Sequence, residues 1–297
     1  MAKINKKNLK NKYKNKYILN FERKIVKNIA KLRLFRKKDK ILVAASGGKD
    51  STVILYILKK YGYNVEAITV DASISAYSKK NLENVIKLCK ENKIKLNILV
   101  FRKEFGYSLC GLQSILVSKG AKFKSCTTCG VLRRYLINKK SRALKPKAII
   151  TGHNLDDEAQ SVLMNLLKNN LEMLARLGPK TGVVKDKKFI PRIKPLYFIS
   201  EKDIAKYSKL MNFPVVYAKC PCASDSYRNH LRNMLDKIEK NNPLVKKNII
   251  DYFLKILPSL RDRFKTKGKI RYCEICKEPA KDKFCQTCKI LSLLKLQ

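Results

Sequence analysis

The sequence has few acidic residues for its length. Its 297 residues contain 23 aspartates and glutamates against 67 lysines and arginines, which gives a formal net charge of +44 at pH 7. Such an excess is unusual for an enzyme that acts on a neutral metabolite, and it predicts a polyanionic partner. Hydrophobic residues still make up 45% of the chain, which allows a folded core and excludes wholesale disorder.

Long hydrophobic runs are also lacking. No segment approaches the ~18 consecutive apolar residues of a membrane span, and the first residues are rich in lysine and asparagine rather than charged and then apolar. We therefore expect a cytoplasmic protein without membrane contact. Most of the ten cysteines stand in Cys-x-x-Cys pairs, which in a reducing compartment bind metals or carry out redox chemistry rather than form disulfides.

Apolar segments alternate with helical patterns between residues 38 and 218. The alternation predicts an α/β fold with a Rossmann-like parallel sheet covered by helices on both faces. We expect strands at residues 41–45, 65–70, 96–101, 148–151 and 214–217. The flanking parts are predicted to be a basic arm and leading helix (1–37), a basic helical region (219–265) and a cysteine-paired tail (266–297).

A glycine-containing loop, SGGKDS at residues 46–51, joins the first predicted strand to a helix. Two glycines let a phosphate approach the backbone, and the free N–H groups at a helix start attract anions. Ser46 and Ser51 add hydroxyl donors, Lys49 a positive charge, and Asp50 a Mg²⁺ ligand or a helix-start carboxylate. The spacing is neither that of a Walker ATPase nor that of a dinucleotide dehydrogenase. The alternative is an ordinary capped turn.

Four cysteines near the end of the chain have the spacing Cys273-x2-Cys276-x8-Cys285-x2-Cys288. Two such pairs form a tetrahedral zinc site, and about thirty residues cannot bury enough apolar surface to fold unaided. Structural zinc supplies an apparent ~10–16 kcal/mol in small domains. We therefore expect a zinc ribbon with four cysteine ligands, and a redox relay is the alternative.

Several separated motifs resemble those of one family. The 46–51 loop is similar to the pyrophosphatase loop, or PP-loop, of enzymes that adenylate a substrate oxygen with ATP. Together with SCTTCG at 125–130, TGHNLDDE at 151–158, PRIKP at 191–195 and the Cys220-Pro221 dipeptide, it makes the chain resemble the TtuA-type tRNA 2-thiouridine synthetases. That family includes the cytosolic thiouridylases of archaea and eukaryotes. This sequence lacks the family's usual N-terminal zinc knuckle, since no cysteine precedes Cys89.

The resemblance implies a PP-loop ATP pyrophosphatase domain that thiolates a tRNA uridine with ATP and Mg²⁺. It implies a [4Fe–4S] cluster on Cys126, Cys129 and Cys220, because three thiolates leave one iron open for sulfur. Cys222 is an alternative third ligand, and a persulfide relay or a structural zinc through the same thiols are alternative chemistries. A catalytic role is implied for Asp157, in proton transfer or Mg²⁺ handling. The implied ATP-binding residues are Ala44, Ser46, Gly47, Gly48, Lys49, Asp50, Ser51, Val70, Arg133 and Gly152.

The basic region after Cys220 is expected to bind tRNA phosphate rather than to be only a solvated face, with Arg228 and Arg232 as RNA-binding residues. Arg133 stands where the family often has a lysine, so it can neutralise phosphate but not act as a base. We expect His153 to be a loop histidine bonded to the backbone. The family further implies a ubiquitin-like thiocarboxylate protein as sulfur donor, and a homodimer.

Three alternatives to a uridine thiolase stay open. They are a related cluster enzyme that thiolates cytidine, another adenylating synthetase, and a non-catalytic zinc RNA-binding scaffold. The target nucleotide, position 34 or 54, is not specified by these residues.

Overall fold

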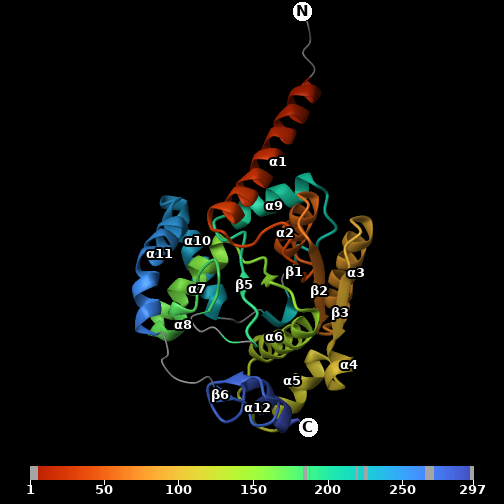
Figure 1. The fold of residues 1–297 in the computed structure, drawn as a ribbon, viewed down its shortest axis with the longest axis vertical. Coiled ribbons are helices and arrows are strands. Elements are labelled where there is room, and N and C mark those ends of the chain that lie inside the picture. Colours follow the sequence, from red (N-terminus) through yellow and green to blue (C-terminus); the bar gives the residue numbers. More distant parts are fainter. Residues whose placement is uncertain are drawn as a thin grey trace, which may run out of the picture.

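A five-stranded parallel sheet forms the centre of the computed structural model, which describes residues 6–182, 186, 188–218, 220–223, 227–264 and 271–294 (Figure 1). The strand order is β3-β2-β1-β4-β5, and every neighbouring pair is parallel. The predicted α/β class is therefore confirmed. The strands are β1 (Ile41–Ala44), β2 (Val65–Asp71), β3 (Leu96–Val100), β4 (Ala148–Ile150) and β5 (Arg192–Ile193).

The fifth strand differs from the prediction. Residues 213–217 form no strand, and β5 pairs with β4 instead, with Arg192 opposite Ile149. Pro214 lacks the N–H that a ladder needs, and β5 already occupies that edge of the sheet. The prediction of a strand at 214–217 is wrong.

One layer of helices packs on the sheet through a large apolar cluster. It joins α1 (Lys6–Lys31), α2 (Lys49–Lys60), α3 (Ser75–Glu91) and α9 (Glu201–Leu210) to the strands. Within α1, Phe21, Ile25 and Ile29 are buried at helical spacing. The helix begins at Lys6, well before Phe21, so the segment expected to be an arm is largely helical. Residues 1–5 of that arm lie outside the described residues.

A second cluster covers the opposite part of the sheet. It joins the ends of β2 and β3 to α4 (Phe101–Phe105), α5 (Leu109–Ser118) and α6 (Ser125–Leu144). The last helix, α12 (Gln286–Leu293), contributes Ile290 to the same cluster. The cysteine-paired tail therefore packs on the domain that contains the parallel sheet, below α5 and α6 in Figure 1. It also contains a short antiparallel pair, β6 (Arg271–Tyr272) and β7 (Pro279–Ala280).

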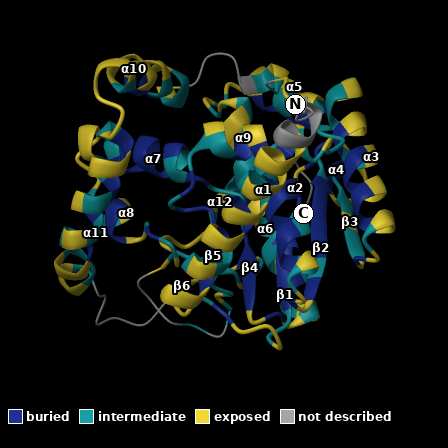
Figure 2. Cartoon of the chain, turned by 90° about the horizontal axis from the view of Figure 1, so that it is seen from above, coloured by how far each residue is buried: buried dark blue, intermediate teal, exposed yellow. Residues whose placement is uncertain are grey.

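A third cluster surrounds the helix that follows β4. This helix, α7 (Leu155–Leu167), packs against α8 (Leu171–Ala175), α10 (Tyr227–Asn241) and α11 (Val245–Arg263). Figure 2 shows α7 largely buried and exposed residues along α10 and α11. A short 3-10 helix, η1 (Pro221–Ala223), precedes α10. The expected boundary at residues 265–266 lies outside the described residues.

A buried ammonium group ties these helices together. Lys246 on α11 lies 2.6 Å from a carboxylate oxygen of Asp156 on α7, 2.6 Å from Asp236 and 3.0 Å from Glu239 on α10. Lys246 is 3% exposed. Because a buried charge is stable only when it is paired, these ion pairs hold α10 and α11 in one place against α7.

No helix among the described residues is both long and apolar enough to cross a lipid bilayer.

Candidate functional site: the nucleotide loop and the thiols beside it

The loop between β1 and α2 is closed by its two serines. The backbone N–H of Ser46 donates to Oγ of Ser51 over 3.1 Å, the two hydroxyl oxygens are 3.1 Å apart, and the Ser51 hydroxyl donates to the carbonyl of Gly48 over 3.1 Å. Helix α2 begins at Lys49, immediately after the glycines. The first N–H groups of a helix have no acceptor within the helix, so the closed loop presents donors to an anion.

Two glycines are needed for the loop to pack. Gly47 has φ +81°, and a Cβ there would lie 2.5 Å from the carbonyl oxygen of Asn81 on α3. A Cβ on Gly152, after β4, would lie 2.8 Å from the backbone nitrogen of Ser51. The sequence suggested that Gly152 makes room for the nucleotide. In the structure, the space at Gly152 admits the backbone of the nucleotide loop itself.

Asp50 and Asp157 are linked by one asparagine. The amide of Asn154 donates to a carboxylate oxygen of Asp50 over 2.9 Å, while its carbonyl oxygen accepts the backbone N–H of Asp157 over 3.0 Å. The N–H of Asn154 donates in turn to the Asp157 carboxylate over 3.4 Å, which completes a capping box at the start of α7.

The pKa values of both acids are raised above the ordinary value for an aspartate. Burial raises the pKa of Asp157, against the opposing positive charge of Arg228. Burial also raises the pKa of Asp50, against the opposing charge of Lys49. A carboxylic acid with a raised pKa, close to an anion site, suits proton transfer.

A further acid, Glu201 at the start of α9, was missed by the sequence analysis. One oxygen accepts from Nζ of Lys49 over 2.7 Å, and the other accepts from Arg232 over 3.0 Å. Lys49 also donates to Asp50 over 3.0 Å. Burial opposes the charge on Lys49, but the carboxylates of Asp50 and Glu201 raise its pKa above the ordinary value. The only sequence signal for Glu201 is its place in the first turn of a helix.

Asp156 faces away from the nucleotide loop. Its carboxylate accepts the backbone N–H of Glu201 over 2.7 Å and the ammonium of Lys246 over 2.6 Å. Asp156 therefore fixes the start of α9, and with it the position of Glu201.

His153 has a side-chain partner rather than the backbone partner that we expected. Its Nδ1 lies 2.9 Å from the hydroxyl of Thr151. Burial, together with the charges of Lys194 and Arg228, lowers the pKa of His153 to about 3. The imidazole is therefore neutral at pH 7.

The cysteines at 126, 129, 220 and 222 come together at the start of α6. Sγ of Cys126 donates to the carbonyl oxygen of Cys222 over 3.2 Å, and Arg133 donates to Sγ of Cys129 over 3.8 Å. Burial and the nearby thiols of Cys220 and Cys129 raise the pKa of Cys126. Burial and the thiol of Cys220 raise the pKa of Cys222 to about 11. The fold thus gathers thiols from two distant segments, as the resemblance implies.

The thiols and the nucleotide loop are connected through α3. Asn81, whose carbonyl packs on Gly47, donates its side-chain amide to the carbonyl of Tyr77 over 2.8 Å. Burial raises the pKa of Tyr77, and the neighbouring Cys220 thiol raises it further. Helix α3 therefore contacts the loop through Asn81, and Tyr77, one turn earlier, is near enough to Cys220 for that thiol to affect its pKa.

Ala44 and Val70 lie at the carboxyl ends of β1 and β2, on the rim where open parallel sheets bind ligands. A polar cavity of about 410 Å³ begins beside Val70, at Asp71, and extends past Ser78 to Cys110. Its lining includes neither Ala44 nor Val70.

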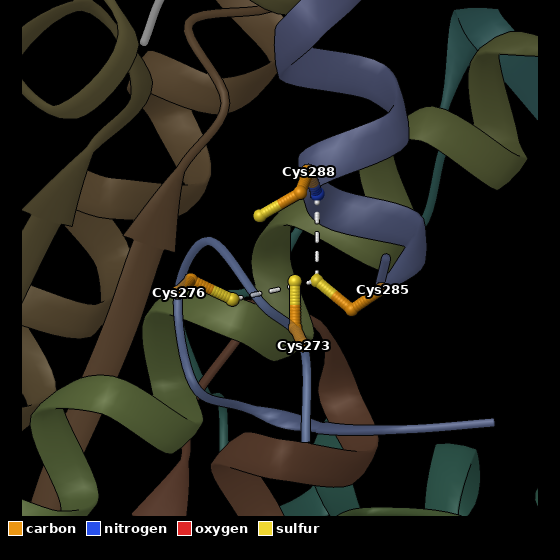
Figure 3. Close-up of side chains that lie close together, drawn as sticks. All are labelled: Cys273, Cys276, Cys285 and Cys288. Carbon is orange, nitrogen blue, oxygen red and sulfur yellow. Dashed lines mark hydrogen bonds between the residues drawn. The ribbon is translucent and has the colours of Figure 1, made fainter. Parts of the chain in front are cut away.

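The four C-terminal cysteines form a compact group (Figure 3). Their Sγ atoms all lie within 4.8 Å of one another. The backbone N–H of Cys288 donates to Sγ of Cys285 over 3.4 Å, and the Cys276 and Cys285 sulfurs are 3.5 Å apart. Burial opposes ionisation of Cys273, but backbone N–H groups lower its pKa to about 6. Four convergent thiols, one of them with a lowered pKa, could hold a metal ion, and four thiolates are a donor set that zinc accepts.

The sheet and its serine-closed loop define a PP-loop protein, and a model of the PP-loop domain matches residues 18–238. The chain is 35% identical to the tRNA-5-methyluridine(54) 2-sulfurtransferase of Pyrococcus horikoshii, over 93% of this chain and 86% of that protein. It is 34% identical to the cytoplasmic tRNA 2-thiolation protein 1 of Drosophila virilis, over 91% of this chain and 78% of that protein. The chain therefore belongs to the family of PP-loop tRNA thiolation enzymes, which confirms the resemblance.

A solved structure agrees with this assignment. The U34-tRNA thiolase NcsA of Methanococcus maripaludis, with its [4Fe–4S] cluster, is 30% identical and superposes with a TM-score of 0.75. The match covers 95% of this chain and 88% of that one.

Proposed function

We propose that this chain is an ATP-dependent tRNA sulfurtransferase that converts a uridine to 2-thiouridine. The observation that carries the proposal is that both parts such an enzyme needs are present. A serine-closed nucleotide loop, and cysteines from two distant segments that meet where Cys126 donates to the carbonyl of Cys222, occur together in one PP-loop chain.

The proposed reaction has two steps. The uracil O2 attacks the α-phosphorus of ATP, the N3 proton is lost and pyrophosphate leaves; sulfur then replaces the adenylated oxygen at C2, and AMP leaves. The loop N–H groups and Lys49 would hold the phosphates. Asp50 would bind Mg²⁺ through its carboxylate, and Asp157 would accept the N3 proton, a role that its raised pKa supports.

The thiol set suits the proposed cluster because its cysteines come from two segments of the chain that meet where Sγ of Cys126 donates to the carbonyl of Cys222. When bound there, a [4Fe–4S] cluster supplies sulfur through the iron that has no protein ligand. The carbonyl oxygen of Cys222 accepts from Sγ of Cys126, and we assign Cys220 as the third ligand because the Cys-Pro dipeptide of the family falls at Cys220-Pro221.

The remaining parts of the proposal concern the tail and the partners. The Cys273, Cys276, Cys285 and Cys288 group would hold a structural Zn²⁺, and the exposed lysines of α10 and α11 would bind tRNA phosphate. The relatives named cytoplasmic tRNA 2-thiolation protein support a cytoplasmic location. A ubiquitin-like thiocarboxylate donor and a homodimer are proposed on the family resemblance alone.

The test is a reaction of anaerobically purified protein with ATP, sulfide and tRNA, followed by AMP measurement and mass spectrometry of the nucleosides. We expect tRNA-dependent AMP and 2-thiouridine, both lost in Asp50→Ala and kept in Glu83→Ala, an exposed acid on α3. 2-Thiocytidine would instead support the cytidine enzyme. Binding of tRNA without AMP formation would support the non-catalytic scaffold.

A further inference from the structure

Two arginines of α10 point toward α7 and α9 rather than out from the basic surface. Arg228 and Arg232 are one helical turn apart and both are partly buried. Arg228 donates to the hydroxyl of Ser161 and, over 3.5 Å, to the carbonyl of Asp157. Arg232 donates to Glu201 over 3.0 Å. Their guanidinium groups therefore lie beside the acids of the candidate site.

The contacts of these arginines are incomplete. A guanidinium carries five N–H donors in a planar fork, and Nε of Arg228 is buried without a hydrogen-bond partner among the described residues. A buried donor without an acceptor costs free energy, so the position favours an added acceptor. An anion bound between α10 and the loop would supply one.

Two cations share the carboxylate of Glu201. Glu201 accepts from Lys49 with one oxygen and from Arg232 with the other, so one carboxylate holds two cations from elements far apart in the sequence. Arg232 has 27% of its side chain exposed and Glu201 has 29%, so an entering anion can reach both. A phosphate is a stronger partner for a guanidinium than a shared carboxylate, because it accepts two parallel hydrogen bonds and carries more charge.

We propose that Arg228, Arg232 and Lys49 together bind the β- and γ-phosphates of ATP and the pyrophosphate product, and that Glu201 is the counter-ion that holds Lys49 and Arg232 in place when no phosphate is bound. The inference rests on the proposed function, because it assigns residues to the same nucleotide site. It moves Arg228 and Arg232 from RNA recognition to phosphate binding, while the exposed lysines of α10 are left to contact tRNA.

The test compares two nucleotides that differ only in the phosphates concerned. ATP and AMP affinities are measured by calorimetry for the wild type, Arg228→Ala and Arg232→Ala. Lys237→Ala, an exposed lysine on the same helix, is the control for loss of one charge. We expect ATP affinity to fall about ten- to a hundredfold in both arginine variants, the size expected for a lost charged hydrogen bond, with AMP affinity and the Lys237→Ala values unchanged.

Glu201→Gln tests the counter-ion with inorganic pyrophosphate as the probe. Removing the competing negative charge should raise pyrophosphate affinity severalfold; a lowered or equal affinity would overturn the role of Glu201. Thermal unfolding of every variant, and Arg232→Lys as a variant that keeps the charge, separate binding from misfolding.

Unchanged ATP affinity with weaker tRNA binding in the arginine variants would overturn the inference and indicate that both arginines bind RNA. Because the readout is nucleotide affinity, the inference can hold even if no thiouridine forms, so its failure and that of the proposed function are distinguishable.

Discussion

The side-chain amide of Asn154 donates to the carboxylate of Asp50 across 2.9 Å, although the two residues are 104 positions apart. The same side chain caps α7 through the backbone N–H of Asp157. One amide therefore joins the start of α2 to the start of α7 and sets the relative position of the two acids to which we assign the chemistry.

Asn154→Ala should affect both stability and activity. Loss of a helix cap lowers the free energy of unfolding by about 0.5–2 kcal/mol, and loss of the bond to Asp50 should reduce tRNA-dependent AMP formation. Asn170→Ala is the matched control, since Asn170 caps α8 in the same way and lies on the exposed side of that helix. Equal AMP formation in the two variants would mean that Asn154 is only a cap.

Cys273→Ser should act on folding of the tail. The side chain is buried among three other thiols, so its loss removes a ligand from a segment with little core of its own. We expect loss of bound zinc and a lower melting temperature, measured by elemental analysis and calorimetry. Cys110→Ser, an exposed thiol outside the group, should change neither. Unaltered zinc content in Cys273→Ser would contradict the structural site.

Alanine variants of Cys126, Cys129 and Cys220 should each lose iron and visible absorbance together, and their activity losses should not add. One lost ligand already removes a shared group. Cys222→Ala should keep both signals, because three protein thiolates are enough to hold the cluster and the substitution keeps the backbone carbonyl that contacts Cys126. Loss of iron in Cys222→Ala but not in Cys220→Ala would show that Cys222, rather than Cys220, is the third ligand. Activity of iron-free wild type would favour a persulfide relay.

His153 should make stability depend on pH. Its pKa is about 3 in the folded chain against an ordinary value of 6.5, so between these pH values the unfolded chain binds a proton that the folded chain does not. The free energy of unfolding should fall as pH is lowered through this window, by at most about 1.4 kcal/mol per pH unit. Urea unfolding at pH 7 and pH 5 should show a weaker dependence in His153→Asn than in His230→Asn, the control at an exposed histidine. The same pH dependence of the free energy of unfolding in both variants would contradict the lowered pKa of His153.

The parts of the fold that the sequence predicted are those with continuous patterns. Strand β1 is an unbroken apolar run and β2 is mostly apolar, and both are largely buried in the sheet. Strand β5 could not be found in the same way, because it is two residues long and lies between prolines. The early start of α1 at Lys6 was missed because the lysine-rich residues before Phe21 carry little apolar periodicity.

The candidate site was predictable where residues adjacent in sequence act together. The 46–51 loop and the four C-terminal cysteines are of this kind. Asn154, Glu201 and the inward direction of Arg232 depend on partners from other elements, and no local spacing indicates them. Long-range pairing of this sort is set by how helices pack on the sheet.

The ammonium of Lys246 stands among the carboxylates of Asp156, Asp236 and Glu239, which otherwise resemble a divalent-cation site. Because the positive charge there is covalently part of the chain, a chelator cannot extract it, and the attachment of α10 and α11 to α7 should survive treatment that strips metals. Chelation thus becomes a selective tool in this protein. A chelator can be used to probe the cysteine sites while α10 and α11 stay attached to α7.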